Sequence, residues 1–170
     1  MSRQGHSSGR GRRSRLLFLG GIVGIGLAAC SPATEGAVGI TRGADGRLVA
    51  VVESCSKPID SLVISRVDTP GYVGQWSPVS AASGRAEVSL QGASPGWRTV
   101  VPPAEFEPTQ TYKMVAGATS ADTTYRTRPL FFRGDDLAGV SPGLVLVGAP
   151  GSEDDPQRLV AGGEFAGAAC

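Results

Sequence analysis

Ser141 is the residue whose surroundings most resemble a catalytic motif. It lies in Gly139-Val140-Ser141-Pro142-Gly143, which has the G-x-S-x-G spacing of a nucleophile elbow. Such an elbow exposes the serine on a strand-to-helix turn, and a histidine takes the proton of its hydroxyl group. The only histidine of the sequence is His6, which lies in a basic stretch. A turn before the apolar run 143–148 is therefore the favoured interpretation.

Two acidic runs could supply carboxylates. Asp135-Asp136 and Glu153-Asp154-Asp155 lack the spaced oxygen ligands of a dedicated calcium loop, so solvated turns are the expected structures. Glycoside chemistry needs only a pair of carboxylates and no histidine, although nothing local singles out such a pair. A cell-envelope hydrolase that uses carboxylates or an unusual serine stays open as the alternative function. No metal or cofactor site is predicted.

The N-terminal stretch has the parts of an export signal. No acidic residue occurs before position 30, and the uncharged run Leu16–Ala29 is shorter than the roughly 20 residues of a membrane-spanning helix. A basic start, a short apolar core and small residues before a break predict a helical signal peptide over residues 1–29 that is cleaved off. Arg12-Arg13 leaves general secretion and twin-arginine export as alternatives. The basic residues of the stretch are Arg3, Arg10, Arg12, Arg13 and Arg15.

The signal ends in a more specific motif. Leu27-Ala28-Ala29-Cys30 resembles the lipobox of bacterial lipoproteins. The resemblance implies that the Cys30 thiol receives a diacylglyceryl group, that the chain is cut before Cys30, and that residues 30–36 form a short tether. Each buried methylene contributes about 0.8 kcal/mol, so two or three acyl chains would hold the protein at the extracytoplasmic face of the cell membrane. The alternative is an ordinary secretory signal that happens to contain a cysteine.

Cleavage would change the charge and remove the histidine. Five of the 16 basic residues lie within 1–29, which leaves 11 basic against all 15 acidic residues, a net charge of −4. This balance disfavours nucleic-acid binding, which usually requires clustered Lys and Arg. With His6 gone, no Ser-His or Cys-His arrangement can form. The remaining length suits a single domain, expected over residues 37–170 as a monomer.

Cys55 and Cys170 are the two remaining cysteines. In an exported domain they predict a disulfide that attaches the end of the chain to its body. Two free thiols, or an exposed terminal thiol that pairs with another molecule, are the alternatives.

Short strands separated by turn residues dominate the rest of the chain. Asp45-Gly46 predicts a tight hairpin between strands over 37–42 and 47–52. Alternating apolar and polar residues over 86–90 predict a half-buried strand, and no long amphipathic helical pattern occurs. Regularly spaced strands of this kind indicate an all-β sandwich. Further strands are expected within 61–67, 73–79, 97–101, 111–118, 123–132 and 143–148.

One stretch points to a more specific class of sandwich. Phe106-x-Pro108-x-Gln110-x-Tyr112 resembles the fibronectin type III pattern, with Gln110 in place of the usual threonine. The resemblance implies an immunoglobulin- or fibronectin-like sandwich in which the Tyr112 hydroxyl bonds back to upstream backbone as a tyrosine corner. Residues 135–170 exceed a standard module and are expected to add an edge strand, a Gly/Asp-rich loop and a terminal cysteine strap.

The chain as a whole resembles a group of small actinobacterial lipoproteins with no assigned activity. The shared features are a strand ending in Cys55, a central Trp76, the turn Pro142-Gly143, and Phe165 near Cys170. The resemblance adds no chemistry.

Aromatic residues are the remaining candidates for recognition. Trp76 is expected in the core, whereas Trp97, Tyr72 and Tyr125 could be core residues or could line a binding surface. The predicted function is that of a membrane-anchored, non-enzymatic module that binds a protein or cell-wall ligand.

Overall fold

The computed structural model describes residues 33–119, 124–148 and 157–170. The chain divides into two compact units, Met1–Cys30 and Ser31–Cys170, and all described residues belong to the second. The expected signal peptide, the expected lipobox with Cys30, and Glu153-Asp154-Asp155 lie outside the described residues.

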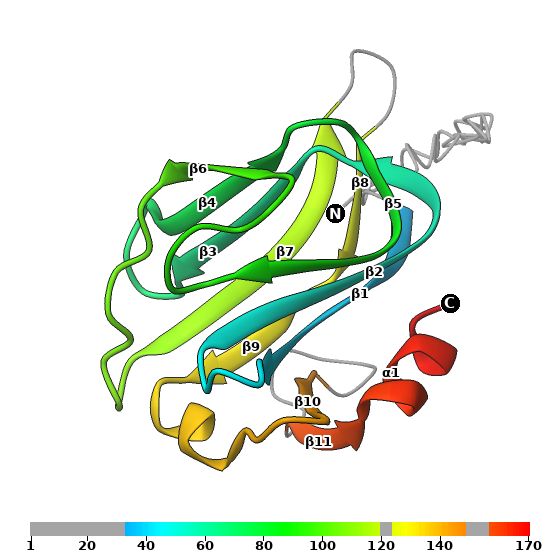
Figure 1. Ribbon diagram of the computed structural model, residues 1–170. Coiled ribbons are helices and arrows are strands. Elements are labelled where there is room, and N and C mark those ends of the chain that lie inside the picture. The colour runs from blue at the N-terminus through cyan, green and yellow to red at the C-terminus, as the bar shows by residue number, and fades with distance from the viewer. Residues whose placement is uncertain (1–32, 120–123, 149–156) are drawn as a thin grey trace, which may run out of the picture. The chain divides into compact units, whose positions relative to one another are not determined.

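The described chain forms strands, one short 3-10 helix and one short α-helix (Figure 1). The elements are β1 (Ala33–Arg42), β2 (Leu48–Ile59), β3 (Ser61–Arg66), β4 (Tyr72–Pro78), β5 (Ala82–Ser89), β6 (Trp97–Val101), β7 (Thr111–Thr119), β8 (Thr124–Arg128), β9 (Leu130–Arg133), η1 (Asp135–Gly139), β10 (Leu144–Val147), β11 (Arg158–Ala161) and α1 (Gly162–Ala169).

Two layers of strands form a nearly closed sandwich. The first layer has the order β5-β2-β1-β10-β11, and all its neighbours are antiparallel. The second has the order β6-β4-β3-β7, and β7 then pairs with β8 and with β9. β1 also pairs in parallel with β8, which joins the layers along one side. β1, β2 and β5 against β3, β7 and β8 is the strand arrangement of immunoglobulin-like sandwiches, so the expected fold class is confirmed.

Local patterns account for most strands. The predicted β1–β2 hairpin forms, and Gly46 adopts the positive φ of 79° that its turn requires. Along β2, Leu48, Ala50 and Val52 alternate toward the core. The expectation that this strand ends at Cys55 was wrong, because β2 continues to Ile59 after an irregularity in its pairing with β5.

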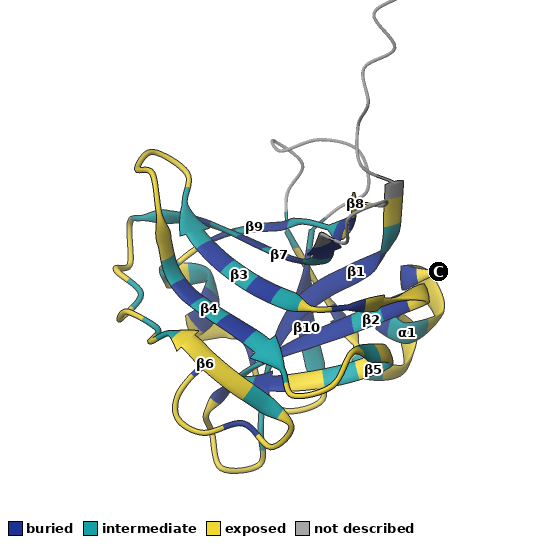
Figure 2. Ribbon diagram, turned by 90° about the horizontal axis from the view of Figure 1, so that it is seen from above, coloured by how far each residue is buried: buried dark blue, intermediate teal, exposed yellow. Residues whose placement is uncertain are grey.

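The main core lies between the layers. Trp76 is fully buried there, as expected from its position in a strand, together with Met114 and Phe132. Figure 2 shows buried positions along β3 and β4. A burial pattern with a period of two thus places one face of each inner strand in the core.

The described part of the C-terminal extension contains more regular elements than expected, and the expected Gly/Asp-rich loop lies outside the described residues. β10 is the predicted additional strand, but β11 extends the layer further and α1 follows it. Phe165 and Ala169 of α1 belong to a second apolar cluster, separate from the main core. This cluster includes Val51, which lies on the other face of β2 from Ala50.

Candidate functional site

Ser141 lies in an exposed turn that leads into a strand. The turn follows η1, and the Leu144 N–H donates to the Ser141 carbonyl oxygen at 3.1 Å. Gly143 has a φ of 85°, a conformation that suits glycine. Because β10 follows and no helix does, the segment is the turn that the sequence favoured and lacks the geometry of a nucleophile elbow.

Arg42 holds this turn in place. Its Nε donates to the Val140 carbonyl at 2.8 Å, and its Nη2 donates to the Leu137 carbonyl at 3.0 Å. Its Nη1 donates to the Gly46 carbonyl at 2.8 Å, so one guanidinium group connects the β1–β2 hairpin with the segment around η1. The sequence contained no signal for this connection, because the Val140 and Leu137 carbonyl groups are more than 90 residues away from Arg42.

The described acidic pair serves the local backbone. Asp135 forms an ion pair with Arg133 at 2.8 Å, and Asp136 accepts a hydrogen bond from the Arg133 N–H at 2.6 Å. Both carboxylates belong to the first turn of the 3-10 helix η1, and both contacts join it to Arg133 at the end of β9. Across residues 33–119, 124–148 and 157–170, no group of three or more His, Cys, Asp or Glu side chains is arranged to hold a metal ion.

The four aromatic candidates differ in how far their side chains are exposed. Trp76 is buried, Tyr125 is 7% exposed and Trp97 is half-buried, whereas Tyr72 is 55% exposed. The indole N–H of Trp76 has no hydrogen-bond partner among the described residues. Of these four side chains, Tyr72 is therefore the most exposed.

Tyr72 borders a shallow, open hollow at the β3–β4 hairpin, lined by residues 65–72. Val67, on the opposite side of the hairpin, is 52% exposed. Between them, Asp68 accepts hydrogen bonds from Thr69 Oγ1 at 3.1 Å and from Gln110 Nε2 at 2.9 Å. The hollow thus combines an exposed ring and an exposed aliphatic side chain with polar groups held by the segment before β7.

Tyr112 supports that segment. Its hydroxyl accepts a hydrogen bond from the Glu107 N–H at 2.9 Å, the upstream backbone contact of a tyrosine corner. The ring stacks on Phe132 at a centroid distance of 5.5 Å, and Phe106 packs edge-on against both rings. Glu107 forms an ion pair with Arg66, the last residue of β3. These contacts attach the loop before β7 to the hairpin that carries the hollow.

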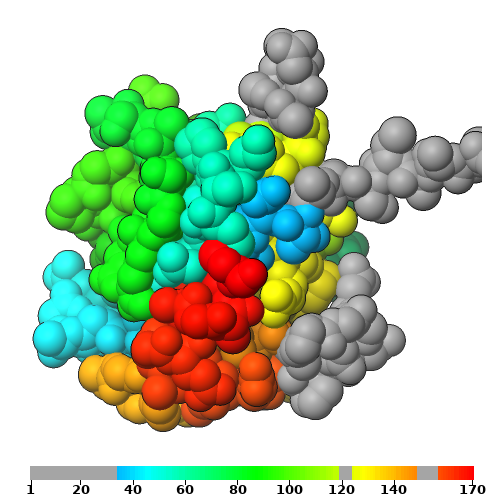
Figure 3. Space-filling model, turned by 90° about the vertical axis from the view of Figure 1, so that its right-hand side faces the viewer, coloured from blue at the N-terminus to red at the C-terminus, as the bar shows by residue number. Residues whose placement is uncertain are grey.

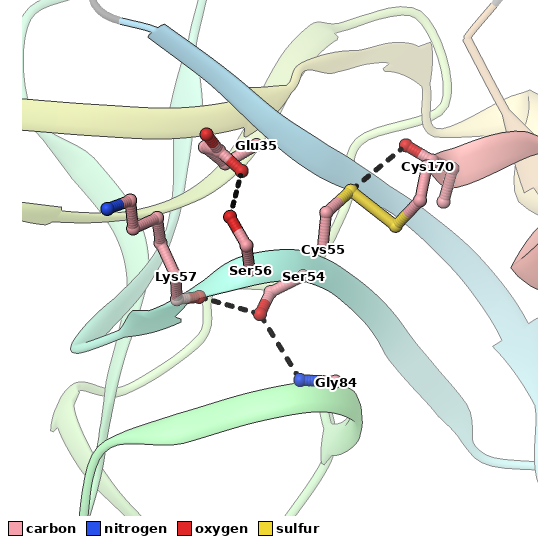
Figure 4. Close-up of a disulfide and its surroundings, with 8 residues drawn as sticks. Glu35, Ser54, Cys55, Ser56, Lys57, Gly84 and Cys170 are labelled. Atoms are coloured by element: carbon pink, nitrogen blue, oxygen red, sulfur yellow. Dashed lines mark hydrogen bonds between the residues drawn. A yellow bond between two sulfur atoms is a disulfide. The ribbon is translucent and has the colours of Figure 1, made fainter.

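The disulfide lies toward the other end of the sandwich. Cys55 and Cys170 are bonded, so the predicted pairing is confirmed (Figure 4). The neighbouring Ser54 is buried, and its hydroxyl donates to the Lys57 carbonyl at 2.7 Å and accepts from the Gly84 N–H at 3.3 Å. These two bonds hold β2 where its pairing with β5 becomes irregular. The sequence did not reveal this role of Ser54.

Charged groups surround Tyr125 at the same end. Burial raises the pKa of the Tyr125 phenol above its ordinary value of 10.0, and the carboxylates of Asp60 and Glu35 raise it further. Glu35 also accepts a hydrogen bond from Ser56 Oγ at 3.0 Å, beside the disulfide.

The helices of the described residues are all too short or too polar to cross a membrane. Comparisons with protein-family models, with curated proteins and with solved structures find no match to this chain.

Proposed function

We propose that the chain is an exported bacterial lipoprotein, anchored through acyl chains on Cys30 at the extracytoplasmic face of the cell membrane, whose sandwich is a non-enzymatic binding module. The observation that carries the proposal is Leu27-Ala28-Ala29-Cys30 directly after a basic stretch and a short apolar run. The resemblance to small actinobacterial lipoproteins belongs to the same proposal.

The disulfide supports export. Disulfides persist in oxidising compartments and are rare in the cytosol. The Cys55–Cys170 bond closes a sequence separation of 115 residues, so it constrains almost the whole domain. A domain with this bond suits the outer side of the membrane.

The position of β1 indicates which end of the anchored domain would face the membrane. Only Ser31 and Pro32 separate Cys30 from Ala33, so the connection spans roughly 10 Å at most when fully extended. Ala33 pairs with Tyr125, and the end of β1 that starts there also faces the Cys55 end of β2. The hollow lies at the opposite end, where Arg66 pairs with Tyr112. Anchoring at Cys30 would therefore present the hollow away from the bilayer.

Tyr72 and Val67 are the proposed ligand contacts. Tyrosine offers a rigid apolar ring with a polar tip, which suits contact with a protein or a wall polymer. Within the described residues these two side chains are the large exposed hydrophobics that flank the hollow.

The anchor is tested by Cys30→Ser, with Cys170→Ser as the matched control that changes a cysteine outside the lipobox. Wild type and Cys170→Ser should enter the detergent phase of a phase-separation assay and carry acyl mass on an N-terminal Cys30. Cys30→Ser should enter the aqueous phase or remain an uncut precursor. Normal processing and detergent partitioning of Cys30→Ser would overturn the proposal.

The binding surface is tested by co-sedimentation with purified cell-wall sacculi from the producing cells. Wild type should sediment, and Tyr72→Ala should lower the bound fraction several-fold. Val79→Ala is the control, because Val79 is 79% exposed but follows β4 at the opposite end of that strand. Equal sedimentation of the Tyr72 variant and wild type, or no sedimentation of wild type, contradicts the assignment of a wall polymer to this hollow.

A further inference from the structure

Helix α1 covers the outer face of the first layer. In Figure 3 it lies across the surface over the strands of that layer. Phe165 is 2% exposed, and Val51, on the outer side of β2, is fully buried. Both belong to the second apolar cluster, whose strand members are Ala37, Val51, Val145, Val147 and Val160. Without α1 this apolar face would meet solvent.

The sequence of α1 does not favour a helix. The segment GGEFAGAA has three glycines, and its N-cap residue, Ala161, makes no side-chain capping bond. Glycine is the least favourable helix residue after proline, and isolated helices shorter than 12–15 residues are marginal in water. α1 therefore depends on its attachments to the sandwich.

The two ends of α1 are attached differently. At the first end the Gly162 N–H donates to the Gly143 carbonyl at 3.0 Å, and Arg85 Nη1 donates to the Gly162 carbonyl at 3.4 Å. Directly after the second end, Cys170 is bonded to Cys55 of β2. Loss of that bond would leave the helix attached at its first end and by the burial of Phe165 and Ala169.

The disulfide is accessible. Cys55 and Cys170 both belong to the exposed residues, although Ala169, the last residue of α1, is buried. Exposed disulfides are the ones that exchange readily with thiols.

We propose that the Cys55–Cys170 bond is a reducible clasp that holds α1 over this apolar face. An extracytoplasmic dithiol reductant supplies the two electrons: one thiolate attacks a sulfur of the bond, and its second thiolate then resolves the mixed disulfide. The sulfur–sulfur bond of the protein breaks, Cys55 and Cys170 become thiols with the two protons of the dithiol, and the reductant becomes a disulfide. α1 then leaves the sheet and uncovers the apolar face. The clasp does not depend on acylation of Cys30.

Hydrogen exchange of the purified mature protein in detergent micelles tests the clasp, with and without dithiothreitol. Reduction should accelerate amide exchange in residues 163–169 at least tenfold, and exchange in β3 and β7 of the main core should stay unchanged. Reoxidation should restore the protection. Cys170→Ser should show the fast exchange without any reductant.

Phe165→Ala is the companion variant. It removes the buried ring but keeps the disulfide, so a dithiothreitol-dependent rise in exchange should remain and start from a higher baseline. Two results would overturn the proposal. In one, α1 stays protected after complete reduction; in the other, β3 and β7 lose protection together with α1, which would make the bond a staple of the whole domain.

Discussion

The Thr127 hydroxyl bonds to both backbone groups of Ala116, accepting from its N–H at 3.0 Å and donating to its carbonyl at 3.2 Å. On this side β7 pairs with β8 from Gly117 onward and with β9 only up to Met114. The hydroxyl of the buried Thr127 thus provides hydrogen-bond partners for the backbone of β7 between these two pairings. At this point β8 pairs with β1 instead. One side chain completes the hydrogen bonding at the junction of the two layers.

Thr127→Val should strongly destabilise the domain, although it only replaces the hydroxyl group by a methyl group. It leaves two buried backbone groups unpaired, and each such group costs about 1–3 kcal/mol. We expect the free energy of unfolding, measured by urea denaturation, to fall by about 2 kcal/mol or more. Thr127→Ser, which keeps the hydroxyl, should recover most of the loss. Thr124→Val, at an exposed position of β8, should stay within about 0.5 kcal/mol of wild type. Equal stability of Thr127→Val and Thr124→Val would contradict this role.

Arg42→Met should loosen the turn that carries Ser141. Three carbonyl groups would lose the guanidinium as a donor. The Leu137 carbonyl would keep the Val140 N–H at 3.3 Å, so the main cost falls on the carbonyl of the buried Val140. We expect a loss of about 1–3 kcal/mol in urea denaturation. Amide exchange over 135–144 should also become faster. Arg47→Met is the control, because Arg47 is exposed and its side chain forms a surface ion pair with Asp45 at 3.5 Å. If exchange over 135–144 does not change in Arg42→Met, the guanidinium is dispensable for the turn.

Tyr125 should make the domain sensitive to alkaline pH. Its folded-state pKa lies above the ordinary value of 10.0, so the folded protein favours the neutral phenol. The stability linked to this group is therefore fully present below pH 10 and is lost as the pH rises through the raised pKa. Tyr125→Phe should lose less stability than wild type between pH 8 and pH 11, measured as the shift of the urea midpoint. Tyr72→Phe, at an exposed ring, should follow wild type. Parallel losses in wild type and Tyr125→Phe would show that the phenol does not control this dependence.

Strand positions were largely predictable from the sequence because their signals are local. Alternation places Leu48, Ala50 and Val52 on one face, and Asp45-Gly46 supplies the turn before them. The segment around Tyr112 was recognisable for the same reason, since the ring and the Glu107 N–H are five residues apart. In each case the pattern and its consequence lie within one turn or one strand.

Helix α1 and the extension of β2 could not be predicted because distant contacts stabilise them. Three glycines argue against a helix over residues 162–169, yet Phe165 is buried in a cluster that includes Ala37 and Val51, more than 100 residues earlier, and this packing holds the helix there. Likewise, β2 passes Cys55 because Ser54 bonds to the Gly84 N–H of another strand. In α1 and at the end of β2, tertiary contacts outweigh the local preferences of the sequence.

The sequence by itself determined the strand pattern, the pairing candidates Cys55 and Cys170, and the stretch Leu27–Cys30 that resembles a lipobox, a linear pattern independent of the fold. Only the tertiary structure decided that Ser141 lies in a turn before a strand, that Tyr72 is exposed while Trp76 is buried, and that α1 covers Val51. Local chemistry and periodicity are properties of neighbouring residues, whereas exposure and cover depend on which distant segments pack together.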